Sequence, residues 1–102
     1  MKHFFIRLNT PRPSFPADIT AAEIALMQKH VNYWSTLMAQ GKVVAFGAVA
    51  DPRGSYGIGI VQLEDDVEPR TLGDDDPVIQ ADAGFTFEVH PMPRLVLPPQ
   101  PA

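Results

Sequence analysis

At 102 residues, with 45% hydrophobic and 20% charged residues, the chain has the length and composition of one globular domain, which excludes wholesale disorder. Twelve acidic against eight basic residues give a formal net charge of −4, and the arginines are scattered, which argues against nucleic acid as a partner. The absence of cysteine excludes disulfides, thiolate zinc sites and cysteine nucleophiles.

The first predicted element is a strand over residues 3–8, because apolar and polar positions alternate there. One face of this strand consists of Phe4, Ile6 and Leu8. The opposite face consists of His3, Phe5 and Arg7. Three prolines within residues 9–17 then predict an irregular loop.

A helix follows, and its two ends have local sequence signals. Thr20 and Glu23 have the spacing of a capping box at the first turn, and Gly41 suits the position just after the last turn. Apolar residues recur every three or four positions, and we expect the stripe that they form to face the core. The stripe consists of Ile24, Met27, Val31, Trp34 and Met38.

Two strands are predicted next, over residues 43–50 and 55–63, joined by a turn at Asp51–Gly54. Gly57 and Gly59 lie on one face of the second strand, where they either admit the close approach of another group or mark a bulge. A short helix is expected to begin near Pro69, and another at Asp76, with Asp76 as the N-cap and the helix running through Gln80. The last predicted strand covers residues 84–90.

The order of these elements is that of the split β-α-β motif. We therefore predict an α+β, ferredoxin-like domain over residues 1–92, with a four-stranded antiparallel sheet and a proline-rich tail over residues 93–102. Helices in this arrangement cover one sheet face only. The other face, which carries Phe5, needs a partner, and we expect a homodimer.

Four short signatures occur in order along the chain: His30 in a helix that ends at Gly41-Lys42, Phe46–Val49 leading into Asp51–Gly54, Asp76-Pro77, and Glu88–Pro91. Their order and spacing resemble those of the YCII-related family. The resemblance covers about residues 2–92. It implies a dimeric α+β barrel with His30 as the candidate catalytic histidine, and some relatives act on lactones. Val78 stands where the family usually has an aromatic residue after Asp-Pro.

His30 and Asp76 form the first candidate site. His30 lies at the edge of the apolar stripe, so it is either a boundary histidine of the core or a general acid/base. Asp76 is either a simple helix cap or a carboxylate that holds one ring nitrogen of His30 and makes the other a better base. Both residues belong to elements on the helical side of the sheet.

A second candidate site lies on the opposite face of the sheet. If the last strand pairs antiparallel with the first, one face brings together His3, Arg7, Glu88 and His90. These residues are either ordinary cross-strand pairs or, once a partner subunit closes over them, a polar lining for a small organic or anionic ligand.

The sequence favours no metal or organic cofactor, because cysteine is absent and the three histidines lie on separate elements. The longest apolar run, Val43 to Ala50, is far shorter than the roughly 20 residues of a membrane span, and no secretory apolar segment precedes Arg7, so we expect a cytoplasmic protein without a membrane partner. Three functional interpretations follow: a cofactor-independent enzyme on a small carbonyl or lactone-like substrate, a non-catalytic ligand-binding or regulatory dimer, and a structural interaction module.

Overall fold

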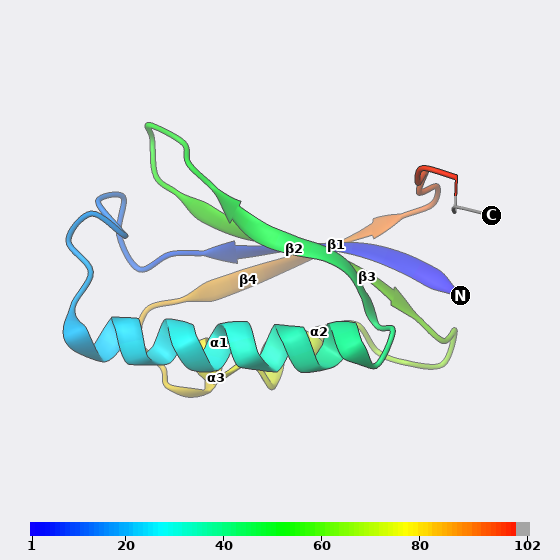
Figure 1. Ribbon diagram of the computed structural model, residues 1–102, viewed down its shortest axis with the longest axis horizontal. Coiled ribbons are helices and arrows are strands. Elements are labelled where there is room, and N and C mark those ends of the chain that lie inside the picture. The colour runs from blue at the N-terminus through cyan, green and yellow to red at the C-terminus, as the bar shows by residue number, and fades with distance from the viewer. Residues whose placement is uncertain (100–102) are drawn as a thin grey trace.

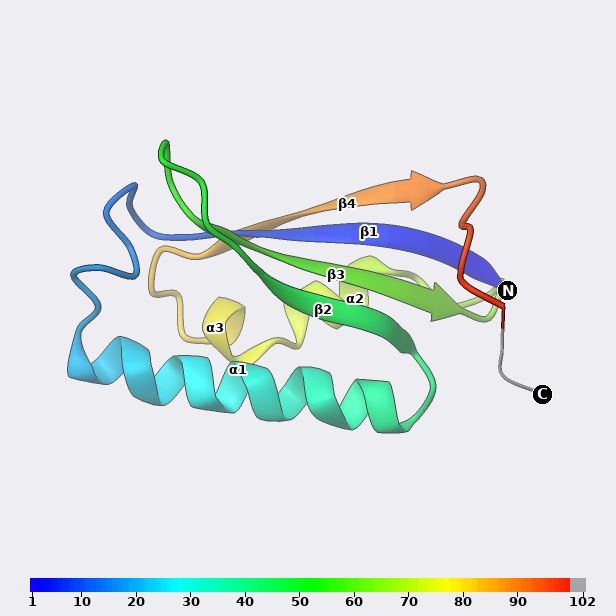
Figure 2. The same ribbon diagram turned by 45° about the horizontal axis from the view of Figure 1, so that its top comes forward.

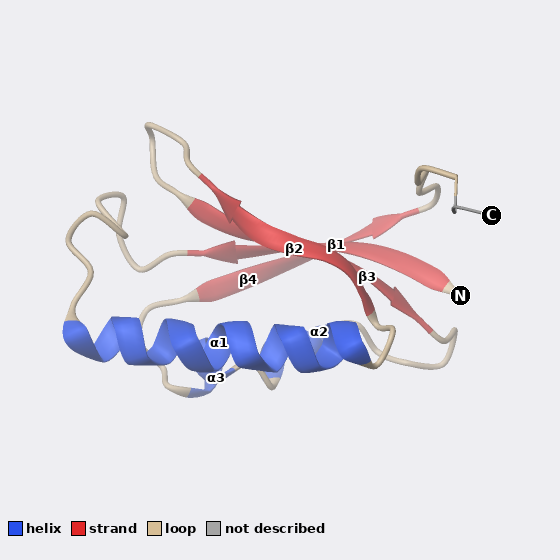
Figure 3. Ribbon diagram, viewed as in Figure 1, coloured by secondary structure: helices blue, strands red, loops and turns tan. Residues whose placement is uncertain are grey.

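In the computed structural model the chain folds into a four-stranded antiparallel sheet with helices on one face (Figures 1 and 3). The structure describes residues 1–99. The elements in chain order are β1 (Lys2–Asn9), α1 (Ala21–Ala39), β2 (Val43–Val49), β3 (Tyr56–Leu63), α2 (Arg70–Asp74), α3 (Pro77–Gln80) and β4 (Thr86–Met92). The strands lie in the order β2-β3-β1-β4, with every neighbouring pair antiparallel. The predicted ferredoxin-like α+β fold is confirmed, and the sheet is open.

Residues close in sequence determine where α1 begins and ends. The Thr20 hydroxyl accepts a hydrogen bond from the Glu23 backbone N–H (3.1 Å), and the Glu23 carboxylate accepts one from the Thr20 N–H (2.9 Å). At the other end Gly41 takes a φ of +79°, which a residue with a side chain rarely adopts. The predicted capping box and helix stop are both present.

The face that α1 turns to the core is not the predicted stripe. Ile24, Val31 and Met38 are 47%, 46% and 39% exposed, so that prediction is wrong for these three residues. The buried positions of the helix are instead Glu23, Trp34 and Leu37. The inward face is rotated toward Glu23 and His30 because both polar side chains find partners on other segments, as described below.

The main core lies between α1 and the sheet. Ile6 of β1 and Val61 and Leu63 of β3 are buried there together with Trp34 and Leu37. Gly59 makes room for the indole, because a Cβ at Gly59 would lie 2.6 Å from Cζ3 of Trp34. Of the two roles expected for the strand glycines, close approach is therefore the one that Gly59 performs.

The two edge strands of the sheet are irregular. β2 has a register shift between Val43 and Ala45. β4 runs two residues further than predicted, to Met92, with Pro91 opposite Phe4 of β1. Proline is tolerated at this position because β4 is an edge strand. In the predicted tail, residues 94–99 contain no helix or strand, and residues 100–102 lie outside the described part of the chain.

All three helices lie on the same side of the sheet (Figure 2). The opposite face carries Phe5 beside Ile60 and Arg7 beside Ile58, all partly exposed. Within residues 1–99 no helix is both long and apolar enough to cross a membrane. The homodimer and the cytoplasmic location stay predictions.

Candidate functional site

The His30 ring and the Asp76 carboxylate meet between α1 and α3. The distance from His30 Nδ1 to Asp76 Oδ2 is 2.7 Å. The two side chains are 12% and 3% exposed, so the contact is shielded from water on most sides. Residues 46 positions apart in the sequence are thus joined by a short hydrogen bond, as the sequence led us to expect.

Asp76 is held by three donors. Its Oδ1 accepts a hydrogen bond from the Val78 backbone N–H (3.0 Å), which makes Asp76 the N-cap of α3. Its Oδ2 accepts from Trp34 Nε1 (2.8 Å) as well as from His30. Asp76 therefore caps α3 through one carboxylate oxygen and is bonded to His30 through the other, and its effect on the basicity of the second ring nitrogen stays a prediction.

Trp34 is the residue of this site that sequence reasoning missed. We assigned it only to the core, and it is indeed 4% exposed. Its indole N–H also needs an acceptor when buried, and Asp76 supplies one. The signal in the sequence was the spacing of Trp34 four residues after His30, which places both on the same face of α1.

This arrangement fixes the chemistry of the imidazole. Nδ1 carries the proton that it donates to the Asp76 carboxylate, so the neutral ring has its lone pair on Nε2. Within residues 1–99 no side chain or backbone group is hydrogen-bonded to Nε2. An imidazole held in this tautomer can accept a proton at Nε2, and the adjacent carboxylate stabilises the cation that results.

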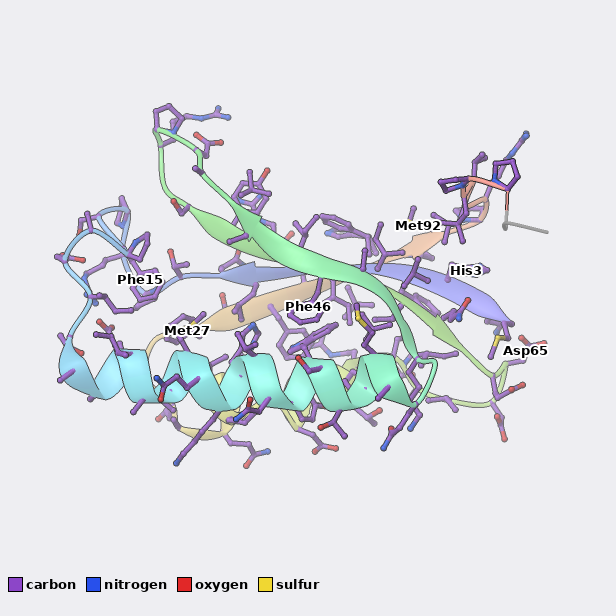
Figure 4. The ribbon with its side chains drawn as sticks, in the orientation of Figure 1. His3, Phe15, Met27, Phe46, Asp65 and Met92 are labelled. Atoms are coloured by element: carbon purple, nitrogen blue, oxygen red, sulfur yellow. The ribbon has the colours of Figure 1, made fainter. Side chains whose placement is uncertain are left out.

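His30 lines a cavity of about 350 Å³ at one end of the sheet. The cavity lies between α1, the strands and the loop that precedes α1. Figure 4 labels three of its lining residues, with Phe46 and Met27 between α1 and the strands and Phe15 in the loop. Beside it Val78 is fully buried in a second apolar cluster with Leu8, Phe15 and Phe85.

Arg12 anchors the loop that forms one wall of this cavity. Its guanidinium donates to both carboxylate oxygens of Glu23 (2.7 Å each), and its Nε lies 2.9 Å from both carboxylate oxygens of Asp18. The hydrogen bonds from Arg12, followed by the one from the Thr20 backbone, lower the pKa of Glu23 to about 2 from an ordinary 4.5. They also explain how a glutamate can be 8% exposed on the inner face of α1.

We expect the Arg12–Glu23 pair to contribute acid-sensitive stability. Because the pKa of Glu23 is lower in the folded than in the unfolded chain, its contribution is fully present above about pH 4.5 and is lost as the pH falls toward about 2. Urea unfolding of wild type and Glu23→Gln should show a difference in unfolding free energy that shrinks across this interval. Glu64→Gln, at an exposed position, is the control, and a difference independent of pH would contradict the prediction.

The second candidate set lies on the other face of the sheet, where three of its four members are in contact. Arg7 stands opposite Glu88 with Nε 3.8 Å from Oε2, and His90 Nε2 lies 3.2 Å from the other Glu88 oxygen. Hydrogen bonds from Asn9 and then from His90 lower the pKa of Glu88. His3 has no hydrogen bond to the other three within residues 1–99, and it lies with Met92 at the far end of the sheet from Phe15 (Figure 4). A ligand-binding role for this set stays a prediction.

Comparison with known proteins identifies the family of this chain and no individual relative. The model of the YCII-related domain matches residues 3–93, which is most of the chain. No curated protein matches it significantly. In the described residues no three histidine or acidic side chains are grouped so that they could hold a metal ion.

Proposed function

This chain belongs to the YCII-related family, and on that premise we propose that it is a cofactor-independent enzyme in which His30 and Asp76 perform acid–base catalysis on a small carbonyl or lactone-like substrate. The observation that carries the proposal is the 2.7 Å bond from His30 Nδ1 to Asp76, on a ring that also lines a cavity. The bond holds the ring in one tautomer, and the cavity provides space for a substrate beside it.

Nε2 of His30 is the atom that exchanges protons with the substrate. It can remove a proton from the carbon next to a carbonyl group, or take one from a water molecule that attacks a lactone carbonyl. In either case the proton moves to Nε2, and the Asp76 carboxylate stabilises the imidazolium. Nε2 then returns a proton to the product, so no net change of the enzyme is left, and the imidazolium can exchange its proton with solvent before this return.

Proton exchange with solvent tests the proposed function directly. In D₂O, the wild-type protein should exchange the α-protons of a cyclic ketone, or open a γ-lactone, faster than buffer alone, as followed by ¹H NMR. If a probe binds in the cavity but neither exchanges nor opens, the second interpretation, a non-catalytic ligand-binding or regulatory dimer, replaces the enzyme.

We further propose a homodimer that uses the sheet face carrying Phe5, because no helix within residues 1–99 covers that face. Phe5→Lys should shift the protein toward monomer in sedimentation equilibrium at micromolar concentration, since it buries a charge in the interface. Met38→Lys places the same charge on the exposed side of α1 and should leave the dimer unchanged. A monomeric wild type, or dissociation by Met38→Lys alone, would contradict this interface.

A further inference from the structure

The cavity beside His30 has almost entirely apolar walls. Its larger apolar side chains are those of Leu8, Phe15, Ile19, Met27, Phe46 and Phe85. The polar residues on its wall are Thr10, His30, Ser55 and Tyr56. Among residues 1–99, no lysine, arginine, aspartate or glutamate lines it. A ligand inside is thus surrounded by apolar groups and meets few hydrogen-bonding partners.

The nearest arginines cannot serve an anion in this cavity. Arg12, from the same loop, is already bonded to Asp18 and Glu23. Arg7 lies on the other face of the sheet, stacked 3.8 Å above the Tyr56 ring, and lines a separate cavity of about 270 Å³. Thr10, Ser55 and Tyr56 lie in the walls of both cavities, and Thr10 Oγ1 donates to the Ser55 carbonyl oxygen (3.1 Å).

An anionic ligand would therefore lose its hydration in the His30 cavity without gaining a cation. Burial of an unpaired carboxylate costs far more than burial of a neutral carbonyl group, which needs a single hydrogen bond. The Asp76 carboxylate lies directly behind His30 and adds a charge of the same sign. The charge of Asp76 and the apolar walls thus both disfavour an anionic ligand.

We propose that the His30 cavity selects an uncharged, largely apolar ring compound with one carbonyl group, whose adjacent C–H group meets Nε2 of His30. Its volume of about 350 Å³ lies near the lower end of the roughly 300–1,000 Å³ typical of ligand sites, which suits a molecule of one or two rings. This inference rests on the proposed function where it concerns the role of His30 in turnover. The preference for uncharged ligands is a binding property, which is measured without turnover.

Ala48 is the position at which a single substitution can narrow the cavity, and a matched control is available elsewhere on the chain. It lines the cavity from β2, on the same strand face as Phe46, and it is itself exposed. A leucine at position 48 would extend into space that the ligand occupies without disturbing a buried residue. Ala39, an exposed alanine at the end of α1 that does not line the cavity, provides the control.

Binding of acetophenone and of benzoate, which match in size and differ in charge, tests the proposal. Trp34 is the only tryptophan of the chain, so the protein has a single indole ¹H–¹⁵N resonance. Because this indole N–H is bonded to Asp76, its resonance reports on the site. Titration with acetophenone should shift this resonance saturably, and benzoate should bind at least about tenfold more weakly. Ala48→Leu should weaken acetophenone binding by about tenfold or more, and Ala39→Leu should not.

Three outcomes would overturn the inference: benzoate binding as tightly as acetophenone, an unchanged affinity in a folded Ala48→Leu protein, or no binding of acetophenone up to its solubility limit. If the proposed enzymatic function is wrong and the binding preference is right, the experiments give a different result. In that case acetophenone still binds with the expected preference, while the wild-type protein exchanges no protons with ketones or lactones.

Discussion

Replacing His30 with glutamine is expected to lower the turnover of a ketone or lactone substrate by about 10²- to 10⁴-fold, the usual contribution of a general acid or base. Glutamine retains hydrogen-bonding groups near Asp76 but cannot accept and release a proton at neutral pH. Because glutamine is similar in size and its side-chain amide can still donate a hydrogen bond to Asp76, the fold should be nearly unaffected. The measurement is kcat for both proteins, with circular dichroism to verify folding.

Lys29→Gln is the matched control for this change, because Lys29 is the preceding residue of α1 and is exposed. It should leave kcat unchanged. Full activity of a folded His30→Gln protein would exclude His30 as the proton-transfer group, and the activity would then have to reside elsewhere.

Replacing Asp76 is expected to affect both stability and turnover, since its two oxygens serve different partners. Asp76→Ala removes the cap of α3, which costs about 1 kcal/mol of unfolding free energy. It also leaves the buried Trp34 N–H without an acceptor, which costs a further 1–3 kcal/mol or so. Turnover should fall as well, because the tautomer of His30 is no longer fixed.

Asp76→Asn separates these two effects. The amide oxygen can still cap α3 through the Val78 N–H, so the cap's contribution of about 1 kcal/mol should be retained, whereas the Trp34 N–H loses its acceptor as in Asp76→Ala. The amide NH₂ then faces Nδ1 of His30 and favours the tautomer with the proton on Nε2, so turnover should still fall strongly. Urea unfolding and kcat measure the two effects, and Asp74→Asn, at an exposed position, is the control. Equal turnover of Asp76→Asn and wild type would contradict an orienting role for the carboxylate.

The parts of the fold that the sequence predicts well are those fixed by neighbouring residues. The capping box at Thr20 and Glu23, the stop at Gly41 and the Asp76-Pro77 helix start all depend on residues within one helical turn. Strand alternation in β1 likewise separates Ile6 from Arg7 without knowledge of the sheet. Local chemistry is sufficient for these features.

The orientation of α1 depends on distant residues, and for that reason hydropathy alone misplaced it. Glu23 serves only as a capping residue in the sequence analysis and His30 lies at the edge of the apolar stripe, but Arg12 and Asp76 satisfy both side chains in the interior. Ile24 and Val31 are therefore displaced to the exposed side. The same reasoning explains why Trp34 was assigned to packing alone, since its acceptor lies 42 positions away.

The irregular margins of the sheet restrict how copies of this chain can associate. A regular outer strand presents a row of unpaired N–H and C=O groups that can add a strand from another molecule. In β4, Pro91 has no N–H to offer, and in β2 the register shift after Val43 interrupts the row on the other margin. Continuous extension of the sheet from molecule to molecule is thereby disfavoured at both margins, and the broad face that carries Phe5 is left as the surface through which the sheet can associate without forming fibrils.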